Sequence, residues 1–193
     1  RERLKTIEQS SKDGAETVRR IQEFSGMRRD KEFTPLSLNE LITDVTNVTQ
    51  PRWKEETQRK GIQIELVKKL GKIPRILGNA SELREVMTNI VFNAVDAMPN
   101  GGEVTITTSI QAEDWVEMRI ADTGIGMTEE VKRRVFDPFF TTKGVTNSGL
   151  GMSVSYGIIR RHGGEILIES QPQHGTTFII HLPTGYGGQE AAV

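Results

Sequence analysis

The chain has 193 residues, a formal net charge of −1 and no cysteine, so it can form one packed domain with an appendage but not a disulfide scaffold or a cysteine-based zinc site. Its balanced charge argues against nucleic acid as a partner, because binding to phosphate backbones requires a basic surface. No apolar run approaches the length of a membrane span, and the charged start does not match a signal peptide. We therefore expect a cytoplasmic segment without membrane contact, whatever anchor the full-length protein carries.

The first 30 residues carry mixed charges and no proline, which favours a helix. Apolar and small residues recur at alternating steps of three and four, the spacing of a coiled-coil or bundle helix. The seam consists of Leu4, Ile7, Ser11, Gly14, Val18, Ile21 and Ser25. Such a helix is marginal in water alone, so we expect it to pair with a second copy of the chain or with another helix of the full-length protein. A helix folded back onto its own domain is the alternative.

The globular part is expected to begin after a polar connector that ends at Pro35. The capping-box pattern at 37–40 predicts the start of a helix, which Pro51 should interrupt. Alternation over 62–66 predicts a half-buried strand, and a short apolar segment at 76–77 leads into the next helix.

Residues 79–98 predict an amphipathic helix with a separate role for each face. The apolar arc consists of Leu83, Val86, Met87, Ile90, Val91, Ala94 and Ala97. The polar stripe consists of Glu82, Glu85, Asn89, Asn93 and Asp96. Two carboxamides and an acid stacked on one face can ligate a hard cation or phosphate oxygens. An ordinary solvated face is the simpler interpretation of any one of these side chains alone.

The second half of the chain predicts further strands and helices. Alternating runs at 104–108 and 116–120 form a β-hairpin, and the sequence DTGIGM follows directly at 122–127. A short charged helix is expected over 129–136, and another helix opens at 149–151.

The chain then closes with a second hairpin, from strands at 166–169 and 177–182. The order of elements predicts an α+β fold. It is a two-layer α/β sandwich in which three helices cover a mostly antiparallel mixed sheet, preceded by the long coiled-coil-type helix.

The glycines indicate where phosphate could bind. Those of DTGIGM do not open a dinucleotide fingerprint, because Glu129 fills its sixth position, and no P-loop sequence occurs. The helix start at 149–151 differs, since its free amides and helix dipole attract anions. The loop before it carries Lys143 and three phenylalanines within 136–140. Such an apolar loop should close on something, which suggests a lid.

Five motifs occur in order: Asn89 to Asp96 on a helix, DTGIGM, FDPFFTTK, SGLGM and HGTTF. In this combination, residues 34–183 resemble the ATP-binding catalytic domain of sensor histidine kinases, in the family that also contains gyrase B subunits, mismatch-repair ATPases and heat-shock chaperone ATPases. Residues 1–33 resemble the second helix of the dimerisation and histidine-phosphotransfer hairpin, and 184–193 read as a disordered tail. The sequences NIVFNAVDAMPNGG and FDPFFTTK most resemble the nitrogen-regulation branch of those kinases.

The resemblance implies a role for each matching position. Asn93 would ligate Mg²⁺ with Asn89 on the phosphate side, Asp122 would accept the adenine amino group, and Lys143 would add charge from the lid. Asn89, Asn93 and Lys143 would thus be catalytic. The implied ATP-binding set is Asn89, Asn93, Asp96, Asp122, Gly124, Gly126, Met127, Lys143, Gly149, Leu150, Gly151 and Thr176. The lid phenylalanines would anchor the lid and contact the phosphotransfer helices, with plain core packing as the alternative.

Two features depart from a complete kinase. The three histidines, His162, His174 and His181, read as a helix C-terminal cation, a loop residue and a strand residue, and none lies on the leading helix. The acceptor histidine is therefore expected on a helix outside this chain, which would bind ATP without phosphorylating itself. Asp96 stands where many sensor kinases have a lysine facing the phosphates, so its role is open.

The resemblance implies a partner set of ATP with Mg²⁺, a second subunit through residues 1–30, the phosphotransfer helix of the full-length kinase and a response-regulator receiver domain. The alternatives are a gyrase-type ATP hydrolase and a non-catalytic nucleotide-binding module. A hydrolase needs a carboxylate to activate water where this chain has Asn89, and an amide is a poor base. The intact asparagine and glycine motifs argue against a degenerate module.

Overall fold

The computed structural model describes residues 32–59, 61–112, 114–143 and 148–185. The predicted leading helix, residues 1–30, lies outside the described residues, as do residues 186–193 of the predicted tail. The strands are β1 (Thr34–Leu36), β2 (Ile64–Leu70), β3 (Ile76–Gly78), β4 (Gly102–Ala112), β5 (Trp115–Asp122), β6 (Glu165–Ser170) and β7 (Thr176–Pro183). The helices are α2 (Leu38–Val48), the π-helix η1 (Pro51–Glu56), α3 (Thr57–Arg59), α4 (Ala80–Asp96), α5 (Glu129–Arg134) and α6 (Gly151–Arg161).

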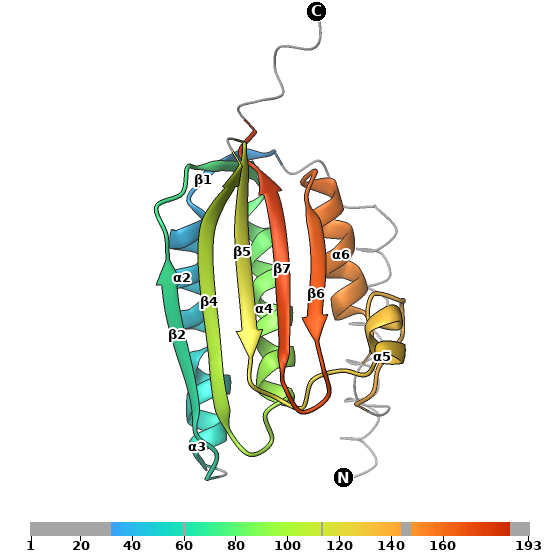
Figure 1. Ribbon diagram of the computed structural model, residues 1–193. Helices are drawn as coiled ribbons and strands as arrows, with labels where there is room; N and C mark the ends of the chain where they lie inside the picture. The colour runs from blue at the N-terminus through green and yellow to red at the C-terminus, as the bar shows by residue number, and fades with distance from the viewer. Residues whose placement is uncertain (1–31, 60, 113, 144–147, 186–193) are drawn as a thin grey trace, which may run out of the picture.

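The main sheet has the strand order β2-β4-β5-β7-β6. Only β2 and β4 are parallel among the described strands, and the other neighbours are antiparallel. Helices α2, α4 and α6 lie together behind the sheet, and no described helix covers its other face (Figure 1). The predicted α+β two-layer sandwich is therefore confirmed.

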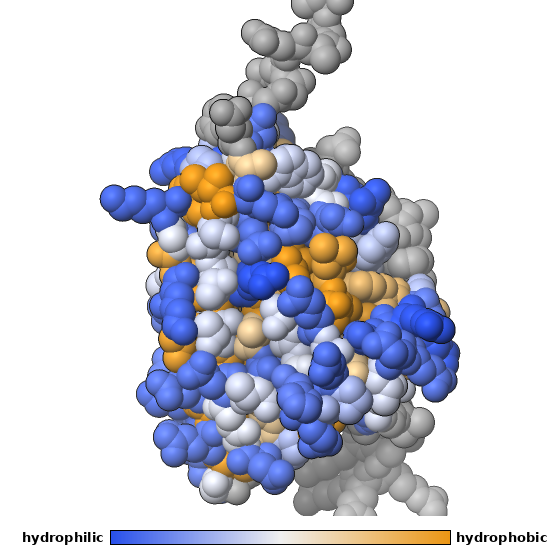
Figure 2. All heavy atoms as spheres, viewed as in Figure 1, coloured by the Kyte–Doolittle hydropathy of each residue, from blue (hydrophilic) through white to orange (hydrophobic). Residues whose placement is uncertain are grey.

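The uncovered face of the sheet is mostly hydrophilic, with apolar patches between the charged side chains (Figure 2). Arg119 and His181 both contact the carboxylate of Glu117 there, at 3.2 and 3.1 Å. Alternation in the strands explains the two faces, because successive side chains point to opposite sides of a sheet. No described helix is both long and apolar enough to span a bilayer.

The core lies between the helices and the covered face of the sheet. From α4, Val86, Ile90 and Val91 are fully buried, and the inward residues of β4 and β5, such as Val104 and Val116, are buried against them. Burying one such aliphatic side chain stabilises the folded state by about 1.5–3 kcal/mol relative to leaving it exposed. The apolar arc predicted for 79–98 thus faces the core, as its spacing indicated.

The helix starts follow their capping residues. The Ser37 side chain accepts the N–H of Glu40, and Asn79 Oδ1 accepts the N–H groups of Ser81 and Glu82, both at 3.1 Å. The interruption expected at Pro51 is also present, because α2 ends at Val48 and a π-helix follows.

Strand β1 is absent from the predicted elements. Thr34–Leu36 pairs antiparallel with Ile76–Gly78 in a separate two-stranded sheet, where Pro35 is tolerated because an edge strand can do without one N–H. Strand β2 also differs from the prediction, since it covers Ile64–Leu70 rather than 62–66. Thr184, which falls in the predicted tail, is buried and donates its N–H to the Asp114 carbonyl.

His162 lies at the end of α6 as expected, but it is not a cation. Its ring is buried, its Nε2 accepts the N–H of Asn79 at 3.0 Å, and its Nδ1 lies 2.8 Å from the Ile158 carbonyl. This pair of bonds fits a neutral ring with the proton on Nδ1. Burial lowers the pKa of His162 from its ordinary value, and Phe33 stacks on the ring at 4.4 Å between centroids. His162 therefore connects α6 with the start of α4.

Candidate nucleotide-binding site

Asp122 ends β5 and is buried. Its Oδ1 accepts the N–H groups of Gly124, at 2.9 Å, and Thr176, at 3.2 Å. Burial raises the pKa of Asp122, while these two N–H groups oppose the rise. Within the described part of the chain, no hydrogen bond reaches Oδ2. This oxygen is thus a hydrogen-bond acceptor without a partner among the described residues.

A hydroxyl that is not among the predicted site residues connects two loops near this acid. Ser170 Oγ accepts the N–H of Met127 and donates to the Gly175 carbonyl, both at 2.9 Å, and lies 3.0 Å from Thr176 Oγ1. Ser170 therefore ties the DTGIGM loop to the turn before β7. Its only sequence signal is that it directly follows the predicted strand at 166–169, before that turn.

The glycines near Asp122 allow close backbone packing. A Cβ on Gly124 would lie 2.5 Å from the Ala97 carbonyl oxygen, and one on Gly126, which has φ +65°, would overlap that of Gln171. Gly175 is equally constrained, because its Cβ would overlap the Asp122 carbonyl oxygen. The implied role of Gly124 and Gly126, passing over a base, is thus accompanied by a packing role that excludes a side chain.

The polar side of α4 meets the lid at Lys143. The Lys143 ammonium donates to Asn93 Oδ1 at 2.8 Å and to Asp96 Oδ2 at 2.9 Å. Arg52 from η1 reaches the other oxygen, Oδ1, of Asp96 at 3.1 Å. Burial acts to raise the pKa of Asp96, but the hydrogen bonds and charges of Lys143 and Arg52 outweigh it and hold the pKa below its ordinary value.

Asn89 contacts α6 rather than the lid. Its Nδ2 donates to the Gly151 carbonyl at 3.1 Å and to Ser155 Oγ at 3.2 Å. Among the described residues, no hydrogen bond reaches its Oδ1, which remains for a ligand. Asn89 thus fixes the start of α6 against α4.

One member of the polar stripe faces elsewhere. Glu82 is buried and pairs with Arg161 at 3.2 Å, so it is not part of the ledge formed by Asn89, Asn93 and Asp96. Glu85 is half-buried and also has an interaction partner.

The start of α6 offers backbone amides. Leu150 is its N-cap and has no side-chain capping bond, so the first amides of the helix need another partner. Gly149 has φ +65°, and a Cβ there would lie 2.5 Å from the carbonyl carbon of Phe139. The glycine therefore lets the Phe139 backbone lie close to the start of α6. Such a start favours an anion.

The three lid phenylalanines divide between packing and exposure. Phe136 packs on the Tyr156 ring at 5.2 Å, and Arg134 covers the Phe140 ring at 4.4 Å. Phe139 is 61% exposed, with φ +66°. Packing therefore explains Phe136 and Phe140, while Phe139 remains open to a partner.

The described residues contain no group of three or more His, Asp or Glu side chains able to hold a metal ion. A metal here would need phosphate oxygens beside Asn93. The residue type fits, because a carboxamide oxygen is a suitable ligand for Mg²⁺, and Asn93 Oδ1 faces a cation here, the Lys143 ammonium, which would move to the phosphates when the metal binds.

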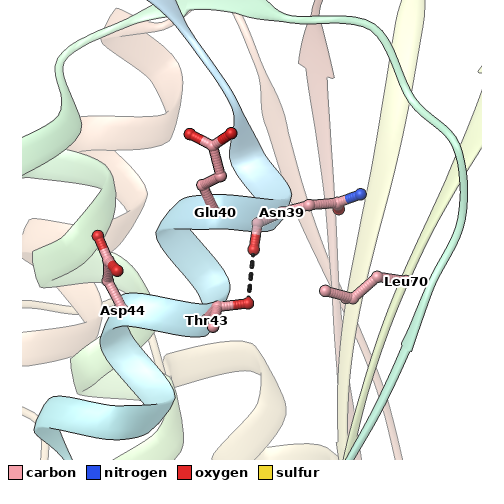
Figure 3. Close-up of a pocket in the computed structure, with 5 residues that line it drawn as sticks. All are labelled: Asn39, Glu40, Thr43, Asp44 and Leu70. Carbon is pink, nitrogen blue, oxygen red and sulfur yellow. Dashed lines mark hydrogen bonds between the residues drawn. The ribbon is translucent and has the colours of Figure 1, made fainter.

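A separate cavity of about 310 Å³ lies between α2 and the end of β2 (Figure 3). It is lined by Asn39, Glu40, Thr43, Asp44 and Leu70. It shares no residue with the site above, and no aromatic or cationic side chain lines it. We therefore assign it no part in nucleotide binding.

A buried carboxylate at a strand end, combined with a carboxamide-bearing helix and a glycine-rich helix start, defines a nucleotide-binding domain of the two-layer type. Residues 78–186 match the family described as histidine kinase-, DNA gyrase B-, and HSP90-like ATPase, and the chain belongs to this family. Sporulation kinase E of Bacillus subtilis (strain 168) is 36% identical over 149 residues, which are 77% of this chain and 20% of that protein.

Two solved structures extend the comparison. The catalytic domain of histidine kinase ThkA is 31% identical with a TM-score of 0.68, covering 80% of this chain and 97% of that one. ThkA in complex with the response regulator TrrA gives 28% identity and a TM-score of 0.71, covering 95% of this chain and 51% of that one. The predicted family is confirmed, and the chain spans about a fifth of the length of sporulation kinase E.

Proposed function

We propose that this chain is the ATP-binding catalytic part of a two-component sensor histidine kinase. It would transfer the γ-phosphoryl group of ATP to a histidine on a phosphotransfer helix. The observation that carries the proposal is the buried Asp122 with a free Oδ2, set beside a ledge that has carboxamides at Asn89 and Asn93. The domain limits 1–33, 34–183 and 184–193, and the nitrogen-regulation branch, remain predictions.

One group of residues would bind the adenine base, and another would bind the phosphates. Asp122 would accept the adenine amino group, supported by Thr176, while Gly124, Gly126 and Met127 would form the loop beside the base. Adenine carries an amino group on C6 of the purine ring, whereas guanine carries a carbonyl on the same carbon. An acceptor at Oδ2 would therefore select adenine over guanine, because two acceptors cannot form a hydrogen bond with each other.

The phosphates would lie along α4 and the start of α6. Asn93 would hold Mg²⁺, which neutralises charge on the phosphate oxygens when bound. Asn89 would contribute its Oδ1, Lys143 its ammonium, and Gly149, Leu150 and Gly151 their amides. Phosphoryl transfer depends on such positioning rather than on covalent help from the protein.

A hydrolase is not favoured. Asn89 cannot act as a base, and its amide nitrogen is already committed to Gly151 and Ser155. The transferred group would then pass to a histidine instead of to water.

The partners follow from the same proposal. Residues 1–30 would pair two subunits. A phosphotransfer helix outside this chain would supply the acceptor, because none of the three histidines, His162, His174 and His181, lies within residues 1–30. The ThkA–TrrA complex supports a response regulator as the next acceptor. The segment would act in the cytoplasm.

Titration calorimetry tests the nucleotide part of the proposal. We expect saturable heat with ATP and Mg²⁺, and much weaker binding of GTP with Mg²⁺. Absence of any heat with ATP and Mg²⁺ would refute both the kinase and the hydrolase interpretations.

A further inference from the structure

Asp96 occupies an unfavourable position for an acid. It is the last residue of α4, where the helix dipole is negative, and the last turn of α4 contains no basic residue. It is also the C-terminal member of the ledge, next to Asn93, where a polyphosphate would bind. A carboxylate here needs compensation from other elements.

Two elements supply that compensation. Each oxygen of Asp96 contacts one cation, Oδ1 the Arg52 guanidinium at 3.1 Å and Oδ2 the Lys143 ammonium at 2.9 Å. Two cations and one carboxylate leave a net positive charge. The cluster therefore presents to the ledge the sign of charge that a polyphosphate requires.

Arg52 is held in place from two further sides. Its guanidinium covers the Phe92 ring at 4.4 Å from the centroid, and its backbone N–H donates to the Thr49 carbonyl at 3.0 Å. The side chain is nonetheless 43% exposed. In the described part of the chain the guanidinium has one hydrogen bond, to Asp96, so its other N–H groups can face a ligand.

We propose that Arg52 is an additional phosphate-binding residue and that Asp96 is a positioning residue that holds it beside the ledge. Lys143 bridges Asp96 and Asn93, so the contacts run without a break from η1 to the ledge. A fixed guanidinium can bind phosphate oxygens with two parallel hydrogen bonds. The inference rests on the proposed function, because it assigns a residue to the phosphate half of that site.

The test compares affinities for Mg-ATP and for adenosine by calorimetry. The variants are Arg52→Met, Arg52→Lys, Asp96→Asn and the double variant Arg52→Met/Asp96→Asn, with Arg84→Met as the control. Arg84 is an equally exposed arginine of α4 that pairs with Asp44 at 3.7 Å. Loss of one charge-assisted hydrogen bond to the phosphates should raise the dissociation constant for Mg-ATP about tenfold.

We expect Arg52→Met to weaken Mg-ATP about tenfold, Arg52→Lys to restore part of this loss, and Arg84→Met to change nothing. Adenosine affinity should stay within about twofold in all variants. Asp96→Asn should weaken Mg-ATP, and adding Arg52→Met should cost less than it does alone, because the guanidinium is no longer positioned.

Four results would overturn the inference. Equal losses for adenosine and Mg-ATP would show a structural role, and fully additive losses in the double variant would separate Arg52 from Asp96. An unchanged Mg-ATP affinity in Arg52→Met, with normal binding by the unmodified chain, would remove this inference and leave the proposed function. Failure of the unmodified chain to bind Mg-ATP would remove both.

Discussion

Replacing Asp122 by asparagine exchanges one oxygen of the site for an NH₂ group. The new carboxamide would keep its Oδ1 on the N–H groups of Gly124 and Thr176, which lie 2.9 and 3.2 Å away in the native chain. Its Nδ2 would then take the place of the free Oδ2. A donor would face the adenine amino group, which is also a donor.

The expected loss of ATP affinity is large. A hydrogen bond to a charged group contributes about 1.5–3 kcal/mol, and leaving its partner unsatisfied adds to the cost. We therefore expect Asp122→Asn to weaken Mg-ATP binding about 100-fold, since each 1.4 kcal/mol is about tenfold.

The same change should not destabilise the free protein. Burial raises the pKa of Asp122, so the folded chain binds this proton more readily than the unfolded chain does. The free energy of unfolding therefore falls as the pH rises above 3.8, the ordinary pKa of an aspartate, because the acid must then ionise in a buried position. A neutral asparagine removes that cost, and the melting temperature at pH 7 should be equal to or above that of the native protein.

Calorimetry and thermal melting of Asp122→Asn measure these two effects, and Asp44→Asn is the matched control. Asp44 is an exposed acid in an ion pair with Arg84, so its variant should bind Mg-ATP normally. Mg-ATP affinity within about twofold of native in Asp122→Asn would refute the assignment of the adenine contact. A marked fall in its melting temperature would instead indicate a structural acid.

Two further predictions concern the ledge and the helix junction. Asn93→Ala should remove the Mg²⁺-dependent part of ATP affinity, so that titrations with Mg²⁺ and with EDTA agree; a remaining Mg²⁺ dependence would place the metal elsewhere. Because burial lowers the pKa of His162 below 6.5, the unfolded chain binds its proton more readily, and stability should fall as the pH drops below about 6.5. His162→Gln should flatten this dependence in denaturant titrations while His174→Gln keeps it, and equal curves for both variants would contradict the neutral assignment.

Local patterns in the sequence are sufficient to predict the elements that short-range features determine. The helix over 79–98 follows from its apolar period and from Asn79, which caps α4 in the structure. The inward residues of β4 and β5 alternate as expected, so their buried faces are predictable.

The remaining features depend on partners distant in the sequence. Strand β1 has three residues including Pro35, and it exists because β3 pairs with it. Arg52 meets Asp96 across 44 positions, a contact that no local pattern records. The predicted charge of His162 is wrong for the same reason, since Phe33 and Asn79 create its buried surroundings.

Candidate site residues are predictable where a motif spans them together. Asp122 and the DTGIGM glycines are nearly consecutive, so their proximity follows from the sequence. Ser170, which bonds Met127 and Gly175, carries no distinctive pattern. The fold alone brings this hydroxyl to the site.

A labelling experiment shows whether this chain transfers phosphate from ATP to histidine. The chain is incubated with γ-labelled ATP, Mg²⁺ and a supplied phosphotransfer hairpin that carries a histidine, beside the same hairpin with that histidine changed to glutamine. We predict acid-labile, base-stable label on the first hairpin and none on the second. Free phosphate released without either hairpin, with no label on the histidine, would contradict the kinase assignment and support a hydrolase.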